Sequence, residues 1–89
     1  MATEYVDCVL AAGFFENELY VILGDSSAIV SRQDVQVVRE PRGQDDGQGK
    51  VCVYIVERKA DRLLVEIPGQ PVVGGLRTWV PNGHTSAVA

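Results

Sequence analysis

The stretch "DCVLAAGFFENELYVILGD" (residues 7–25) decides the fold, because a similar stretch, "VCVYIVERKADRLLVEIPG" (residues 51–69), follows it along the chain. In both, apolar residues alternate with polar ones or form short runs rich in valine, isoleucine and leucine. This pattern is typical of β-strands joined by turns. No segment of ten or more residues has the periodicity of an amphipathic helix, so the sequence predicts an all-β protein.

Alternation and turn residues predict seven strands along the chain. They lie at residues 4–11, 18–23, 28–31, 35–39, 50–57, 62–67 and 76–80. Short strands separated by frequent glycine and proline predict a small β-barrel or a barrel-like sandwich, and the pattern is similar to SH3-like barrels. The length of 89 residues suits one such unit, so residues 1–89 are predicted to form a single small β domain.

The two similar stretches indicate an internal repeat. Cys8 aligns with Cys52 at a separation of 44 residues, whereas Val30 best matches Val80 at a separation of 50. The second copy therefore carries six extra residues, which fall within "PGQPVVGG" (residues 68–75). Chance similarity between two alternating β sequences is the alternative explanation.

The repeat divides the chain into two three-stranded halves, at about residues 4–39 and 50–84. A unit of this size is too small to enclose a core alone, so the halves are expected to share one core. The linker at 40–49 has no apolar residue and is predicted to be exposed and mobile. Residues 82–89 are predicted to form a flexible tail.

The period-two rule assigns one face of two strands to the core. These core positions are Leu19, Val21, Leu23, Leu63, Val65 and Ile67. The opposite face of strand 18–23 is also apolar, because it carries Tyr20 and Ile22. A strand that is apolar on both faces is expected to be covered on both, and a second subunit is one candidate for the cover.

Charge and composition restrict the class of protein and its compartment. The net charge is −4, and residues 1–38 hold six acids but one base, which disfavours a general nucleic-acid-binding domain. The N-terminal "MATEYVDCV" lacks the basic region of a signal peptide, and the longest apolar run, "VCVYIV", is too short to span a membrane. Two cysteines are too few for a disulfide framework. These features predict a cytoplasmic protein with reduced thiols and no membrane partner.

Catalytic, metal and cofactor sites are not predicted. His84 is the one histidine, and no motif provides it with a nucleophile or an orienting acid. Two cysteines 44 residues apart do not have the spacing of zinc ligands, and "GQDDGQGKV" (residues 43–51) has the wrong spacing for a phosphate-binding loop. The protein is therefore predicted not to be an enzyme, and Cys8 and Cys52 are predicted to be core residues.

Binding residues are sought among apolar, aromatic and cationic side chains next to turns. The candidates are Phe14, Phe15, Val72, Val73, Arg77 and Trp79. Two adjacent phenylalanines in a hairpin tip cannot both point inward, so one either packs under the turn or is exposed to a partner. Trp79 either shares an outer face with Arg77 or caps the open end of the barrel.

The leading hypothesis is a non-catalytic β-barrel binding or assembly module that acts through protein–protein contacts and self-associates into a homo-oligomer. One alternative is a small-barrel module that binds nucleic acid through aromatic stacking and a basic groove. Its residues would be Arg58, Lys59, Arg62, Arg77 and Trp79. Another alternative is an acidic inhibitor or accessory protein of a basic partner.

Overall fold

The computed structural model describes residues 2–13, 15–82 and 85–87, and within these ranges the protein is built from strands and one 3₁₀ turn, η1, at Arg32–Asp34. The strands are β1 (Thr3–Ala12), β2 (Glu18–Leu23), β3 (Ser26–Ser31), β4 (Val35–Arg39), β5 (Gly47–Arg58), β6 (Arg62–Glu66), β7 (Gln70–Val73), β8 (Arg77–Pro81) and β9 (Thr85–Ala87). The all-β class predicted from alternation is confirmed.

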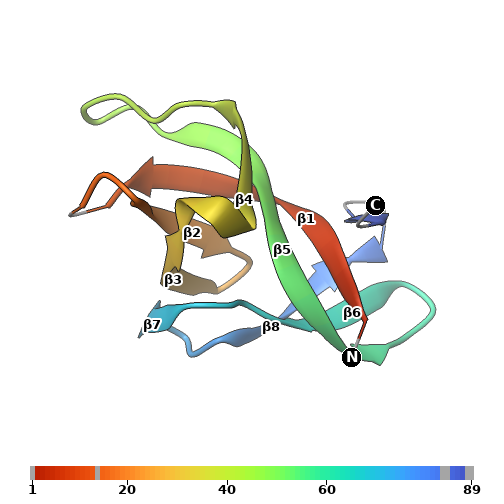
Figure 1. Ribbon diagram of the computed structural model, residues 1–89. Helices are drawn as coiled ribbons and strands as arrows, with labels where there is room; N and C mark the ends of the chain where they lie inside the picture. The colour runs from red at the N-terminus through yellow and green to blue at the C-terminus, as the bar shows by residue number, and fades with distance from the viewer. Residues whose placement is uncertain (1, 14, 83–84, 88–89) are drawn as a thin grey trace.

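The strands form one antiparallel sheet in the order β7-β3-β2-β1-β5-β6-β8, with β4 added to β5 and β9 added to β1. Figure 1 shows the sheet curling around itself, with the long strands β1 and β5 side by side in its middle. A strongly curled sheet encloses apolar side chains on its inner face, so a domain of this size acquires a core without a second layer of helices. The small barrel-like architecture is therefore also confirmed.

The two long strands change partners along their length. The first part of β1 lies between β5 and β9, and its second part lies between β5 and β2. The first part of β5 lies between β1 and β4, and its second part lies between β1 and β6. The ladder between β1 and β5 has Val6 opposite Val51, where both strands are about to change partner. The two short added strands thus lie on different long strands, β4 on β5 and β9 on β1.

The inner face of the curled sheet holds the core. Its buried apolar residues are Val6, Cys8, Leu10, Leu19, Val21, Leu23, Ala28, Val30, Val51, Val53, Ile55, Leu63, Val65, Ile67 and Val80. All six core positions predicted from β2 and β6 are among them. At about 25 cal/mol per Å² of apolar area removed from water, this cluster is the main source of stability for the domain.

Cys52 differs from its prediction as a core residue. Cys8 is buried, whereas Cys52 is half-buried, because it lies between the inward-facing Val51 and Val53 on β5. The register of β5 against β6 shifts between Ile55 and Glu57, which indicates a β-bulge. On β5 the residues that face the core before the bulge are Val51, Val53 and Ile55, so Cys52 does not occupy a core position of the kind that Cys8 occupies on β1.

Three segments predicted to be irregular contain strands. The loop "PGQPVVGG" includes β7, which pairs with β3, and the predicted tail includes β9, which pairs with β1. The predicted linker ends earlier than expected, because β5 begins at Gly47. Glycine is required near the start of β5. A Cβ added to Gly49 would lie 2.5 Å from the carbonyl oxygen of Gln36 and 2.9 Å from Cδ1 of Leu10. The close approach of backbones explains the glycines at the start of β5, where a side chain would collide with the neighbouring strand.

Candidate functional site

The six predicted binding residues do not form one site. Phe14 lies outside the described residues. Phe15 is 69% exposed in the turn between β1 and β2, whereas Val72 and Val73 are exposed on β7. Arg77 and Trp79 lie on the outer face of β8, where they alternate with buried residues. The structure therefore separates the candidates into a hairpin tip, a β7 edge and a β8 face.

One outer surface of the sheet has an uncharged and largely apolar centre, bordered by Asp7 on β1 and Glu18 on β2. We call it the β1–β3 face; it consists of Val9, Ala11, Tyr20, Ile22, Ser27 and Ile29, with Val73 at its edge. The register places these side chains in two rows across the strands: Val9, Ile22, Ser27 and Val73 in one, and Ala11, Tyr20 and Ile29 in the other. Contiguous apolar surface on a small protein commonly marks an interaction site.

The side chains of the β1–β3 face are partly exposed to solvent. Val9 is 36% exposed and Val73 is 58% exposed, while Tyr20, Ile22 and Ile29 are half-buried. The hydroxyl groups of Tyr20 and Ser27 lie 2.8 Å apart and form a hydrogen bond. This bond satisfies the polar atoms of the face locally, so covering the face leaves no unpaired hydroxyl group.

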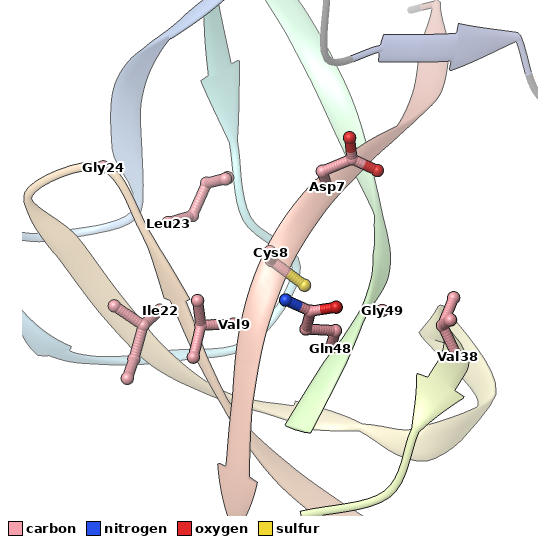
Figure 2. A pocket seen from close by; sticks show the side chains of 9 residues that line it. All are labelled: Asp7, Cys8, Val9, Ile22, Leu23, Gly24, Val38, Gln48 and Gly49. Carbon is pink, nitrogen blue, oxygen red and sulfur yellow. The ribbon is translucent and has the colours of Figure 1, made fainter. Parts of the chain in front are cut away.

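A pocket adjoins the face where β1 leaves β2 (Figure 2). It has a volume of about 530 Å³ and is formed by residues of β1, β2, β4 and β5 together with the turn after β2. Its lining is Asp7, Cys8, Val9, Ile22, Leu23, Gly24, Val38, Gln48 and Gly49. Val9 and Ile22 belong to both the pocket and the β1–β3 face. Val38, on the opposite rim, is 73% exposed.

The thiol of Cys8 in the pocket wall is not a nucleophile. Burial raises its pKa to about 12, and the negative charge of Asp7 adds to the rise. The thiolate is the reactive form, so a thiol with this pKa is protonated and inert near neutral pH. The pocket therefore offers shape and apolar contact, without covalent chemistry.

A second outer face, on β6 and β8, has a different character. Trp79 is half-buried there, with the guanidinium carbon of Arg62 at 4.4 Å and the ammonium nitrogen of Lys59 at 5.1 Å from the centre of its ring. In the same face Nε of Arg77 donates a hydrogen bond to Glu66 at 3.0 Å. Cation–π contacts of this kind stabilise the tryptophan locally. The ring is thus covered in part by residues of its own chain.

The basic residues proposed for a nucleic-acid groove are engaged within the protein. Arg58 donates a hydrogen bond to Glu4 at 2.7 Å, and Arg77 pairs with Glu66. Lys59 and Arg62 lie over the ring of Trp79. A groove that binds the phosphate backbone needs excess positive charge, and here two of the arginines are paired with carboxylates.

The described part of the chain was compared with the requirements of a metal site and of a membrane-spanning helix. Within it, no group of three His, Cys, Asp or Glu side chains is placed to hold a metal ion. No helix in this part of the structure is long and apolar enough to cross a membrane. His84 lies outside the described residues.

No family model, curated protein or solved structure matches this chain. Sequence reasoning identified Tyr20 and Ile22 as a second apolar face but missed Val9, Ile29 and Val38. The alternation of Val9 and Ala11 with the core residues of β1 was a usable signal for the first of these.

Proposed function

We propose that this protein is a non-catalytic assembly module that binds a second copy of itself through the β1–β3 face. One observation carries the proposal: the outer side of the first three strands presents two cross-strand rows of side chains without a charge, although the chain as a whole has a net charge of −4. Exposed sheet surfaces that face water normally alternate with polar and charged residues.

The absence of charge on this face favours a second copy over an unrelated partner. In a two-fold symmetric dimer the same patch meets itself, so any charge near the axis meets a like charge. Two copies with a net charge of −4 repel each other over most of their surfaces. The β1–β3 face is a region where that repulsion is locally absent. A domain of 89 residues also gains stability when association buries more of its apolar surface.

An SH3-like, duplicated architecture is part of the same proposal. Its support is the arrangement of strands around the pair Val6 and Val51: β2 and β3 lie beyond β1 as β6 and β8 lie beyond β5. Each half then ends in a strand that crosses to the other half. A cytoplasmic location is likewise a proposal, supported by Cys8 and Cys52, which are free thiols in the structure.

The two other functional hypotheses have less support. Binding of nucleic acid is disfavoured by the ion pairs of Arg58 and Arg77 with glutamates. For an acidic inhibitor, two of the six acids in residues 1–38 are offset, because Asp7 pairs with Lys50 at 3.0 Å and Glu4 pairs with Arg58. Such an inhibitor would have to act through Glu16 and Glu18 at the first hairpin tip.

Sedimentation velocity tests the proposal directly. We expect the weight-average sedimentation coefficient to rise from that of a monomer to that of a dimer between about 1 and 100 μM, the range of moderate interfaces. Because salt screens the repulsion between two copies of net charge −4 and leaves apolar contacts intact, the dissociation constant is expected to fall between 50 and 500 mM NaCl. A species that remains monomeric at the highest concentration would refute the proposal.

A further inference from the structure

Phe15 is an exposed aromatic side chain without cover on its own chain. It is 69% exposed, in the turn that joins β1 to β2, and it is the more exposed of the two large aromatic residues on the surface of the described chain, the other being Tyr54 at 40%. Aromatic residues are enriched among the residues that dominate binding energy at interfaces. Phe15 is therefore the candidate anchor residue of this hairpin tip.

The pocket beside the β1–β3 face has the size and chemistry that an aromatic ring requires. A cavity of about 150 Å³ is sufficient to hold a benzene ring, and this pocket has a volume of about 530 Å³. Val9, Ile22 and Val38 supply apolar contacts, and Gln48 supplies a polar group at the rim. The pocket accordingly has room for a phenylalanine and part of the turn that carries it.

Phe15 cannot fill the pocket of its own chain. The turn that carries it lies at the start of β2, beside Glu18, whereas the pocket lies at the end of β2, beside Leu23 and Gly24. Five residue steps along a strand separate these ends by about 17 Å. Phe15 can therefore reach such a pocket only on another molecule.

In a face-to-face dimer, a two-fold axis that lies in the plane of the interface and crosses β2 at right angles exchanges the two ends of this strand. The axis would pass near Tyr20, midway along the strand, and would bring the hairpin tip of one molecule over the pocket of the other. We propose that Phe15 of each copy inserts into the pocket of a second copy, so that the dimer contains this contact twice. This inference rests on the proposed self-association and specifies its contacts.

Charges around the two elements are complementary. Glu16 and Glu18 flank the hairpin tip, whereas Asp7 in the pocket lining is offset by Lys50, whose ammonium nitrogen lies 3.0 Å from its carboxylate. Arg39, which follows the pocket residue Val38 and lies opposite Gln48 in the ladder, donates its hydrogen bond to the backbone carbonyl of Asp46 and keeps its charge. When the tip of one copy docks on the pocket of another, its acids approach Arg39. Such rim charges orient the encounter and fix the register of docking more than they add to affinity.

Two single variants test the contact by sedimentation equilibrium. Phe15→Ala removes the ring, and Val38→Glu places a carboxylate on the pocket rim, where it also repels Glu16 of the incoming tip. Each is expected to weaken dimerisation at least about tenfold, the effect of truncating an interface anchor. The control is Tyr54→Ala, which removes an exposed aromatic side chain from β5 and is expected to leave the dissociation constant unchanged. Phe15 and Val38 are both exposed, so thermal melts of the two variants in dilute solution should show that each remains folded.

A mixture of the two variants provides the decisive measurement. In a mixed dimer, Phe15 of the Val38→Glu copy meets the intact pocket of the Phe15→Ala copy, so one of the two contacts is restored. We expect the dissociation constant of this heterodimer to be several-fold lower than the mean of the dissociation constants of the two homodimers. If wild-type protein dimerises and Phe15→Ala dimerises equally well, the pocket contact is wrong while the proposed function stands. If the wild-type protein is monomeric, the proposed function fails as well.

Discussion

Gly24 lies so close to Thr78 that a Cβ atom added to the glycine would be 2.7 Å from the threonine Oγ1. Gly24 forms the turn between β2 and β3, and Thr78 is a buried residue of β8, the last strand of the sheet path. The contact therefore joins parts of the sheet that are far apart in strand order. It is one of the places where the curl of the sheet closes on itself.

Substitution of Gly24 by alanine is expected to destabilise the domain strongly. Its φ of +58° is unfavourable for a residue with a side chain, and the new methyl group would also displace Thr78. We expect a loss of about 2–3 kcal/mol in the free energy of unfolding. Gly43 is a matched control, because its φ is +57° and no atom lies within 4 Å of its added Cβ. Gly43→Ala should cost about 1 kcal/mol in the same urea titration; equal losses would contradict the closure contact.

The strands with local alternation of apolar residues were predicted from the sequence, whereas those defined by non-local pairing were not. The core positions of β2 and of β6 with the following Ile67 were predicted from alternation, because these six apolar residues repeat at period two. β7 was missed because its pairing with β3 is non-local and its residues carry turn signals such as Pro71. The start of β5 was missed because glycines are what allow β4 to approach it. The β-bulge at Ile55 and Glu57 has no signature in the alternation, so the face of Cys52 was assigned wrongly.

The candidate site was less accessible to sequence reasoning than the core. The doubly apolar β2 indicated a covered surface, and the uncharged β1–β3 face around Tyr20 and Ile22 is consistent with that. The pocket requires Val38 and Gln48 to be near Val9, and this proximity depends on β4 and β1 both flanking β5. Tertiary pairing of this kind is not encoded in any local pattern.

Cys8 is expected to make stability fall at alkaline pH. In the folded state its pKa is raised from the ordinary value of 9.0 to about 12 by burial, so the unfolded chain loses this proton first. Between these two pH values unfolding releases a proton, and the free energy of unfolding should fall by about 1.4 kcal/mol per pH unit from this group. Below pH 9 its contribution is fully present.

The measurement compares urea denaturation of wild-type protein and the Cys8→Ala variant at several pH values from 7 to 11. Wild-type protein should show the steeper decline above pH 9, after the constant cost of the substitution is subtracted. Cys52→Ala serves as a control for the loss of a thiol from β5. Parallel pH profiles for wild type and Cys8→Ala would show that the Cys8 thiol does not remain buried and protonated.

Trp79→Ala is expected to destabilise the monomer to an intermediate extent. The ring is half-buried, pairs across the ladder with Leu64, and has Arg62 and Lys59 over it. Removal of a fully buried tryptophan side chain lowers the free energy of unfolding by about 3–5 kcal/mol, so removal of this half-buried ring should lower it by about 2 kcal/mol. In a domain of 89 residues this lowers the melting temperature by roughly 8–16 °C.

The appropriate control for Trp79 is Phe15→Ala, measured in dilute solution where the protein is a monomer. Phe15 is 69% exposed, so its removal should change the melting temperature by no more than a few degrees. If Trp79→Ala were as mild as Phe15→Ala, the cation–π cluster would contribute nothing to the fold. The outer face of β6 and β8 would then be free to bind a partner through the tryptophan.

Ile22→Glu is expected to abolish dimerisation while leaving the monomer folded. Ile22 belongs to the β1–β3 face and is half-buried, so glutamate can place its carboxylate in water in the monomer but not in a covered interface. Two copies of a carboxylate in an apolar interface are each desolvated without a partner, a cost of several kcal/mol. Leu64→Glu is the matched control, because Leu64 is a half-buried residue of the other outer face, opposite Trp79. Sedimentation velocity should show a monomer for Ile22→Glu and a concentration-dependent dimer for Leu64→Glu; the reverse result would move the interface to the face of β6 and β8.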